Sequence, residues 1–323
     1  QTNLLLSETY TQGSKRLAND LQAAFHQIES LENQTLAYKN ASIILEPVGR
    51  NTAPAITAAM LQIINGVDKQ DSIMLDLSAD HEINDIEEFQ KTINVAKIYA
   101  EKGRLVTFGI VPKSPNTGFG YINFSGDINS DIFEVKKFVE KPNQKTAESY
   151  INDGCYLWNS GMFMFDSNQL LQELSSYCPE ILNAVRQSFD NATQDLDFIR
   201  LESDFFESSP NNSIDYALME KSNNVVVIKL DVGWSDVGSW QSLYEISEKD
   251  MNGNVLKGDI FEEETFNSYI DAGNHVVATI GVSDLIIIDT PDATLISSKD
   301  QARINYPRQL LKSFREGMKR MLP

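Results

Sequence analysis

Cysteine, basic side chains and long apolar runs are all scarce in this chain of 323 residues. The two cysteines, Cys155 and Cys178, are too few for a disulfide scaffold and have no metal-binding neighbour at short spacing. We expect both to be reduced thiols. No apolar run approaches the roughly 18 residues that a membrane-spanning helix needs, and residues 1–10 lack the basic start of a signal peptide. These absences predict a cytoplasmic location and no membrane partner.

The shortage of positive charge limits the ligands of the protein. Lys and Arg number 27 against 46 Asp and Glu, which gives a formal net charge of −19. Such an acidic surface repels nucleic-acid backbones and anionic lipids, so we expect no nucleic-acid partner. A phosphate substrate would need a local basic cluster or a metal ion to offset this field. The hydrophobic content of 41% is ordinary for a globular protein with a full core.

Apolar runs alternate with helical patterns in the first third of the chain. We expect strands at 3–6, 41–45, 72–77 and 104–110, and helices at 15–30, 54–65 and 86–101. The strand at 72–77 is expected to be buried on both faces. This rhythm favours an α/β fold with a Rossmann-like, mainly parallel sheet that has helices on both faces.

The pattern changes twice further along the chain. Strands at 120–124 and 133–139 suggest an antiparallel insertion; a strand at 156–165, helices within 167–191 and a buried strand at 225–230 follow. After about residue 250, short strands recur roughly every ten residues, which suits a small β-solenoid-like domain. An amphipathic helix at 307–321 is expected to close the chain. We therefore divide the chain into a larger domain, 1–250, and a small β-domain, 251–323.

The first segment with candidate chemistry, Glu46 to Ala55 (EPVGRNTAPA), follows a strand and opens a helix. Ligands of open α/β sheets bind beyond the carboxyl ends of strands. Arg50 and Asn51 could therefore contact base edges or phosphate oxygens. The alternative is an ordinary helix start that is capped by Asn51 or Thr52.

Two further segments place a carboxylate after a buried strand. Asp80 lies in LSADHEI and Asp236 lies in GWSDVGSW. The two carboxylates could approach each other across neighbouring strand ends and share a Mg²⁺ ion, because this cation prefers oxygen ligands. Alternatively, Asp236 caps a helix that begins near Val237. We interpret the single His81 as a structural residue.

Three weaker segments complete the set. FVEKP contains Glu140, which can accept hydrogen bonds from sugar hydroxyls, and Lys141, which can bind a phosphate as a point charge. WNSGMF contains Asn159 beside a glycine, and PNTGFGYI is a glycine-rich turn into a strand. Taken alone, the first pattern is also typical of a surface ion pair, and the other two are typical of ordinary turns.

In this order, the six segments resemble the mannose-1-phosphate guanylyltransferases, and the resemblance covers roughly residues 40–300. EPVGRNTAPA and GWSDVGSW are its more specific motifs. The resemblance implies a fold of the nucleotide-diphospho-sugar transferase type. It also implies the reaction, in which mannose 1-phosphate attacks the α-phosphorus of GTP in line and gives GDP-mannose and pyrophosphate. A reaction of this kind depends on positioning and charge neutralisation rather than on a general base.

The resemblance also assigns roles to individual residues. It implies a Mg²⁺ ion held by Asp80 and Asp236, with these two residues and Lys141 as the catalytic set. The implied guanosine-binding residues are Glu46, Gly49, Arg50 and Asn51, and the implied sugar-phosphate-binding residues are Gly120, Tyr121, Glu140, Lys141 and Asn159. A homodimer is compatible with the resemblance.

One departure from the family is large. The family begins with a strand and a loop of the form Gly-Gly-x-Gly-x-Arg-Leu-x-Pro, which binds the triphosphate, and only residues 13–17 (GSKRL) faintly resemble it. We therefore expect the chain as given to fold but to turn over GTP poorly. Two alternatives remain: a pyrophosphorylase for another sugar or nucleotide, and a non-catalytic sugar-nucleotide-binding relative or fragment.

Overall fold

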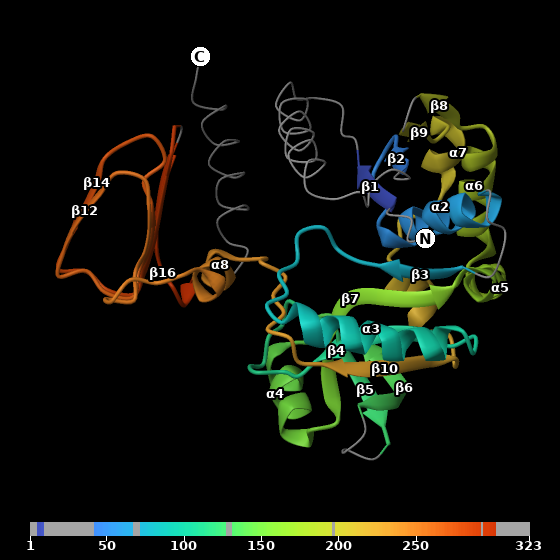
Figure 1. Ribbon diagram of the computed structural model, residues 1–323, viewed down its shortest axis with the longest axis horizontal. Helices are drawn as coiled ribbons and strands as arrows, with labels where there is room; N and C mark the ends of the chain where they lie inside the picture. Colours follow the sequence, from blue (N-terminus) through green and yellow to red (C-terminus); the bar gives the residue numbers. More distant parts are fainter. Residues whose placement is uncertain are drawn as a thin grey trace. The chain divides into compact units, whose positions relative to one another are not determined.

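Two units, each with its own hydrophobic cluster, make up the described part of the chain (Figure 1). The computed structural model describes residues 5–9, 42–66, 72–126, 131–195, 198–291 and 293–301. The larger unit comprises the described residues up to Ser78 together with Glu87–Asp231. The smaller unit comprises Ala79–Ile86 and the described residues from Val232 onward. The division predicted at residue 250 stays a prediction.

The larger unit is built around a six-stranded sheet with the order β3-β7-β4-β10-β6-β5. Its strands are β3 (Ile73–Asp76), β4 (Leu105–Ile110), β5 (Tyr121–Ser125), β6 (Ile132–Val139), β7 (Tyr156–Asp166) and β10 (Val225–Leu230). The positions of all six strands and the antiparallel pairing of β5 with β6 were predicted correctly. The sheet, however, is mixed rather than mainly parallel. Only β4 and β10 pair in parallel, because the long β7 lies antiparallel between β3 and β4.

Burial corrects one expectation for this sheet. Within β3 only Met74 is buried, and Leu77 just beyond the strand is 45% exposed. The prediction of a strand buried on both faces was therefore wrong. The reason is its position, because β3 is the edge strand of the sheet that the described residues form. Strand β4, which lies inside the sheet, is buried along its whole length.

A second sheet of four strands has the order β1-β2-β9-β8. Its strands are β1 (Leu5–Thr9), β2 (Ser42–Glu46), β8 (Thr193–Asp195) and β9 (Phe198–Arg200). β1, β2 and β9 are parallel neighbours, which agrees with the strands predicted at 3–6 and 41–45. The helices predicted at 15–30 and 307–321, and the loop-like residues 13–17, lie outside the described residues.

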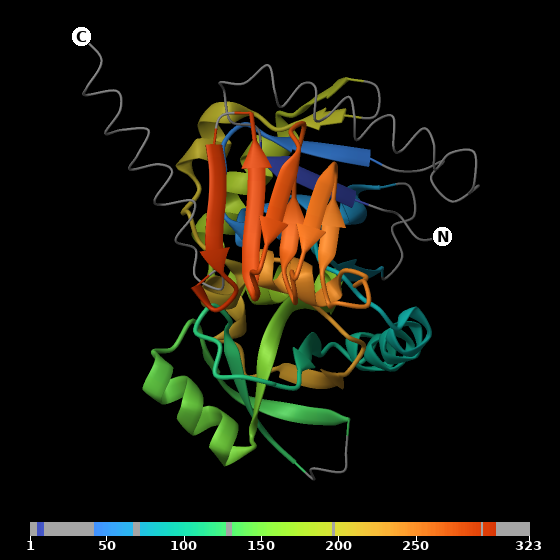
Figure 2. The same cartoon turned by 90° about the vertical axis from the view of Figure 1, so that its left-hand side faces the viewer.

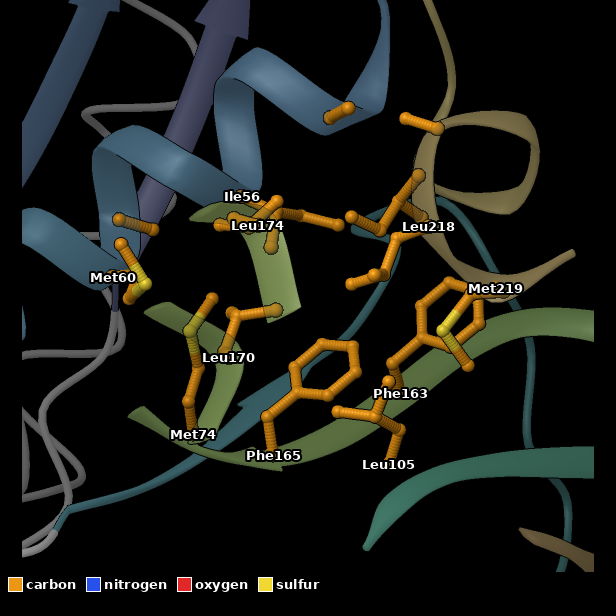
Figure 3. Packing of buried hydrophobic residues seen from close by; sticks show 14 of the residues in the cluster. Ile56, Met60, Met74, Leu105, Phe163, Phe165, Leu170, Leu174, Leu218 and Met219 are labelled. Atoms are coloured by element: carbon orange, nitrogen blue, oxygen red, sulfur yellow. The ribbon is translucent and has the colours of Figure 1, made fainter. Parts of the chain in front are cut away.

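Helices of the larger unit cover a core that Figure 3 shows in part. Ile56 and Met60 of α2 (Thr52–Asn65) point toward side chains of α5, β3, β4 and β7 in this cluster. Pro54 suits the first turn of α2 because its missing N–H needs no partner there. The remaining elements of the unit are α3 (Ile86–Ala100), α4 (Gln144–Asp153), α5 (Ser167–Tyr177), α6 (Pro179–Asp190), α7 (Ser203–Ser208) and a π-helical turn, η1 (Asp215–Met219). The helices predicted at 54–65, 86–101 and 167–191 are confirmed as α2, α3 and the α5–α6 pair.

The smaller unit is the β-solenoid-like domain that the strand spacing predicted. After α8 (Trp240–Ile246) come β11 (Val255–Lys257), β12 (Ile260–Glu263), β13 (Tyr269–Asp271), β14 (Val277–Ile280), β15 (Leu285–Thr290) and β16 (Ala293–Ser298). Strands from successive turns pair in parallel, as β11-β13-β15 and as β12-β14, and Figure 2 shows these strands side by side. β16 closes the coil in the antiparallel direction.

Candidate active site

A β-bulge in β7 sets the position of Asn159. Against β4, Gly109 pairs with Asn159 and Thr107 pairs with Phe163, so two steps along β4 correspond to four along β7. Gly161 lies in this bulge with a φ of 71°, a conformation that glycine adopts at little cost. The Ser160 hydroxyl donates to the carbonyl of Phe108 at 2.6 Å and fixes the bulge to its neighbour strand. The segment that looked like an ordinary turn in the sequence is therefore an interruption of a buried strand.

The Asn159 side chain has partners on both ends of its amide. Its Nδ2 donates to Oδ1 of Asp215 at 2.7 Å, and its Oδ1 accepts from the backbone N–H of Gly161 at 3.2 Å. Its own backbone N–H donates to the carbonyl of Gly120 at 2.8 Å. Asn159 thus connects the predicted glycine turn to the π-helical turn η1.

Gly120 and the FVEKP segment lie against each other. A Cβ atom at Gly120 would lie 2.5 Å from Oε2 of Glu140 and 3.3 Å from the Asn159 side chain, so a larger residue here would require the Glu140 carboxylate to shift. Glu140 forms an ion pair of 3.1 Å with Lys141, whose side chain is 65% exposed. The structure therefore brings Gly120, Glu140 and Asn159 into contact and leaves the Lys141 ammonium accessible beside them.

Tyr121 has a different environment from these neighbours. Its side chain is fully buried beside the ring of Tyr150, and its hydroxyl donates to the carbonyl of Asn116 at 2.9 Å. Burial raises the pKa of this phenol above its ordinary value. Any contact of Tyr121 with a ligand would have to use the lone pairs of its hydroxyl or its backbone.

Two acids at this site escaped the sequence analysis, Asp76 and Asp215. Burial first, and then the charge of Asp215, raises the pKa of Asp76 to about 7. Burial also raises the pKa of Asp215, and the carboxylate of Glu140 adds to the effect, whereas the hydrogen bond from Asn159 opposes it. An acid directly after an apolar run, as in IMLD, or within one, as in IDYALM, was the signal that could have revealed both. The larger unit therefore places Asp215 against the Asn159 amide, with Asp76 and Glu140 close enough to Asp215 for the charges to interact.

The predicted guanosine-binding loop is fixed to a distant part of the same unit. Glu46 is buried, Gly49 is half-buried, and a side-chain nitrogen of Arg50 donates to the carbonyl of Glu207. Asn51, at a φ of 70°, accepts from the backbone N–H of Thr52 at 2.9 Å and is the N-cap of α2. The capping alternative thus describes what the Asn51 oxygen does in this structure, while the loop stays a prediction as a nucleotide site.

The segments that contain Asp80 and Asp236 pair in the smaller unit. Glu82 and Ser235 form an isolated antiparallel bridge through backbone hydrogen bonds of 2.9 and 3.0 Å. Asp80 is exposed, and Oδ1 of Asp236 accepts from the backbone N–H of Gly238 at 3.2 Å. Asp236 does not cap a helix, because α8 begins at Trp240 and its cap is Ser239. That alternative was wrong.

His81 is close enough to both of these carboxylates for their charges to act on it. Burial lowers the pKa of His81, while Asp80 and Asp236 act in the opposite direction, so both carboxylates are near the imidazole. Its Nδ1 accepts from Nε1 of Trp234 at 3.2 Å, and the two rings meet edge to face. This packing agrees with a structural role for His81. No group of three or more His, Cys, Asp or Glu side chains that could hold a metal occurs in the described part of the chain.

The larger unit defines the class of protein. Residues 13–253 match the family model described as nucleotidyl transferase, which covers more than half of the chain, so the chain belongs to that family. Residues 261–304 match a second model, the MannoseP isomerase/GMP-like beta-helix domain. None of the helices among the described residues is long and apolar enough to cross a membrane.

The relatives of the chain are more specific. It is 49% identical over 269 residues to a mannose-1-phosphate guanylyltransferase of Salmonella montevideo. The alignment covers 81% of this chain and 56% of that protein. It is 47% identical over 263 residues to the enzyme of the same name from Escherichia coli K12, and this alignment covers 80% of this chain and 55% of that protein. The family resemblance noted in the sequence is therefore confirmed. The chain spans somewhat more than half the length of these curated relatives.

Two solved structures resemble the chain in fold. A Thermus thermophilus protein described as a mannose-1-phosphate geranyltransferase superposes with a TM-score of 0.76 at 28% identity, over 96% of this chain and 84% of that one. A Helicobacter pylori protein described as a mannose-6-phosphate isomerase gives a TM-score of 0.60 at 28% identity, over 72% of this chain and 83% of that one.

Proposed function

We propose that this chain has the nucleotidyltransferase function of its curated relatives and forms GDP-mannose and pyrophosphate from mannose 1-phosphate and GTP. The observation that carries the proposal is the contact of Gly120, Glu140 and Asn159 in the larger unit, with Lys141 beside them. These are the residue types that a sugar phosphate needs: acceptors for hydroxyl groups, an amide donor and a cation for the phosphate.

The residues divide between the two substrates. Glu140 would accept hydrogen bonds from mannose hydroxyls, Asn159 would donate an N–H, and Lys141 would bind the phosphate. Glu46, Gly49, Arg50 and Asn51 would line the guanosine site, with the loop held by the bond from Arg50 to Glu207. The nucleophile is already an anion, so these residues need only orient it and neutralise charge.

Asp80 and Asp236 fit a shared Mg²⁺ ion by their chemistry. Mg²⁺ commonly takes one or two carboxylates and completes its shell with water and substrate phosphates. The pairing of the two segments and the effect of both carboxylates on His81 support this pair, and Asp236 uses one oxygen for Gly238. A bound Mg²⁺ would supply positive charge to the triphosphate, which a protein with a net charge of −19 otherwise repels.

The test of the proposed function is calorimetry of the purified chain with mannose 1-phosphate, followed by an assay for GDP-mannose with GTP and MgCl₂. We expect binding of mannose 1-phosphate in preference to glucose 1-phosphate. Product would support the enzymatic function, and binding without product would favour the non-catalytic alternative. The absence of binding to either sugar phosphate would contradict the proposal.

Lys141→Ala tests the phosphate contact directly. Because the Lys141 side chain is 65% exposed, its ion pair with Glu140 contributes little to stability, about 0–1 kcal/mol. We expect the variant to bind mannose 1-phosphate roughly tenfold more weakly, with a nearly unchanged melting temperature. Lys136→Ala, which removes an exposed lysine from β6, is the matched control and should bind as the wild type does. A large loss of stability with unchanged binding would make Lys141 a structural residue.

The cytoplasmic location and the homodimer remain predictions from the sequence. Size-exclusion chromatography with light scattering would measure the assembly.

A further inference from the structure

We propose that Asp215 is a positioning residue that fixes the Asn159 amide in one orientation, so that one amide N–H is left to bind the sugar phosphate. This inference rests on the proposed function of the larger unit. It adds to that function a residue that no sequence motif had singled out. Four observations carry it: the partners of the amide, the charge of the carboxylate, the backbone that holds it, and the bulge that presents Asn159.

The partners of the amide define its orientation. An asparagine side chain has one carbonyl oxygen and two N–H donors. The oxygen accepts from the Gly161 N–H at 3.2 Å, and one donor binds Asp215 at 2.7 Å. If the amide were reversed, its NH₂ group would face the Gly161 N–H, and its oxygen would face the carboxylate. Both contacts would then be repulsive, so the pair of partners selects one orientation.

This orientation leaves a defined donor. Asp215 takes one of the two N–H bonds of Nδ2, and the second has no acceptor among the contacts of the described residues. This second N–H is therefore available to a ligand oxygen. Asn159 itself lies against Gly120, whose carbonyl accepts from the Asn159 backbone N–H at 2.8 Å. A fixed donor costs less side-chain entropy on binding than a mobile one does.

The charge of the carboxylate argues for a specific role. Asp215 lies near Asp76, Glu140 and Glu220, and both its burial and the charge of Glu140 disfavour its ionised form. For folding alone, a neutral acceptor at this position would avoid the cost of a buried charge. What the carboxylate adds is a stronger, charge-assisted bond to the amide.

The backbone at Asp215 is itself well anchored. Asp215 is the first residue of η1, and π-helical turns of this kind occur frequently at functional sites. Just before it, the Ile214 N–H donates to the Thr52 hydroxyl at 2.9 Å, and Asn212 exchanges two backbone hydrogen bonds of 3.2 Å with Arg50 and Ala53. The carboxylate therefore stands on a segment that is fixed to the start of α2.

Three variants of the full chain test the proposal. Asp215→Asn keeps an acceptor oxygen, Asp215→Ala removes it, and the double exchange Asn159→Asp with Asp215→Asn reverses donor and acceptor. Each is measured by thermal unfolding and by calorimetric binding of mannose 1-phosphate. A charge-assisted hydrogen bond is strong enough for its loss to weaken binding about tenfold.

We expect Asp215→Asn to bind within about threefold of the wild type and Asp215→Ala to bind about tenfold more weakly. The double exchange remakes the internal hydrogen bond and keeps an acceptor for Gly161, so its melting temperature should lie near that of the wild type. Its binding should nevertheless be lost, because a carboxylate at position 159 offers no N–H and repels the phosphate. A purely structural role predicts the opposite, namely binding that recovers with stability.

Two results would overturn the proposal: wild-type affinity in Asp215→Ala, or restored affinity in the double exchange. A wild type that does not bind mannose 1-phosphate would instead contradict the proposed function. The orientation is then tested without ligand, by NMR of the Asn159 side-chain amide in a chain labelled with ¹⁵N-asparagine. Slow exchange of one amide proton in the wild type and its loss in Asp215→Ala would support the positioning role, and equal exchange in both would refute it.

Discussion

At the residue scale, the larger unit holds acidic groups where its proposed ligand is an anion. Asp76 lies on the same face of β3 as the core residue Met74, because alternate residues of a strand point to the same side. The charged group that raises its pKa further is also an acid, Asp215. The candidate site thus combines an amide and a lysine, the proposed phosphate ligands, with carboxylates that destabilise one another when ionised.

Asp76→Asn should change how stability depends on pH. Folding raises the pKa of Asp76 from its ordinary value of 3.8 to about 7, so the folded state binds this proton more tightly than the unfolded chain does. The stabilisation is therefore complete below about pH 4 and is lost as pH rises through about 7. Each tenfold change in proton affinity is worth about 1.4 kcal/mol, which sets an upper limit of about 4 kcal/mol for this loss.

We therefore expect Asp76→Asn to be more stable than the wild type at pH 8 and to differ much less at pH 5. Urea unfolding at both pH values measures this difference. The control is Asp153→Asn, which changes an exposed acid at the end of α4 and should shift stability little at either pH. An equal effect of Asp76→Asn at pH 5 and pH 8 would show that its proton affinity is ordinary.

At the element scale, the bulge of β7 determines the orientation of the Asn159 side chain. In a regular strand, Asn159 and Gly161 would lie on one face, and the side-chain oxygen of Asn159 would not accept a hydrogen bond from the backbone N–H of Gly161. The bulge forms this bond because Gly161 adopts a positive φ, and Ser160 secures it on the neighbouring strand.

Gly161→Ala should strain the bulge and weaken ligand binding. A Cβ atom there meets nothing within 4 Å, so the cost is one of backbone conformation, about 1–2 kcal/mol. Gly154→Ala is a matched control, since Gly154 also has a positive φ, 67°, and open space around its Cβ position, but it ends α4. Both variants should lose similar stability in thermal unfolding, and only Gly161→Ala should lose affinity for mannose 1-phosphate. Equal affinities would show that the bulge does not control the position of Asn159.

The sequence predicted these elements well but not how they are arranged. Periodicity and apolar runs located the strands of the six-stranded sheet, because buried strands are rich in apolar residues at neighbouring positions of the sequence. The antiparallel placement of β7 depends on its pairing with β3 and β4, which are far away in the chain. No local sequence pattern indicates such a pairing. For the same reason Gly120 and Glu140 could be predicted as candidates, whereas the bond of Asn159 to Asp215, 56 residues away, could not.

At the scale of the whole molecule, the two units have separate hydrophobic clusters. The core of the larger unit includes Leu174 and Leu218, and the smaller unit packs its own cluster, which includes Tyr269, Ile286 and Ile288. The candidate sugar-phosphate residues all belong to the larger unit, while Asp80 and Asp236 belong to the smaller one. A substitution that destabilises the core of one unit should therefore leave the stability of the other unit unchanged.

Ile286→Ala should destabilise the smaller unit alone. Ile286 is fully buried, and truncation of a buried isoleucine to alanine typically costs about 2–5 kcal/mol. Hydrogen–deuterium exchange should therefore accelerate in β11–β16, while protection of β4, β7 and β10 stays at the wild-type level. Leu174→Ala, which removes a fully buried side chain from α5, is the reciprocal variant and should accelerate exchange in the larger unit only. Because the candidate sugar-phosphate residues lie in the larger unit, Ile286→Ala should also retain mannose 1-phosphate binding. Faster exchange throughout the chain in both variants would mean that the units unfold as one cooperative body, and the separate interiors would then not be energetically independent.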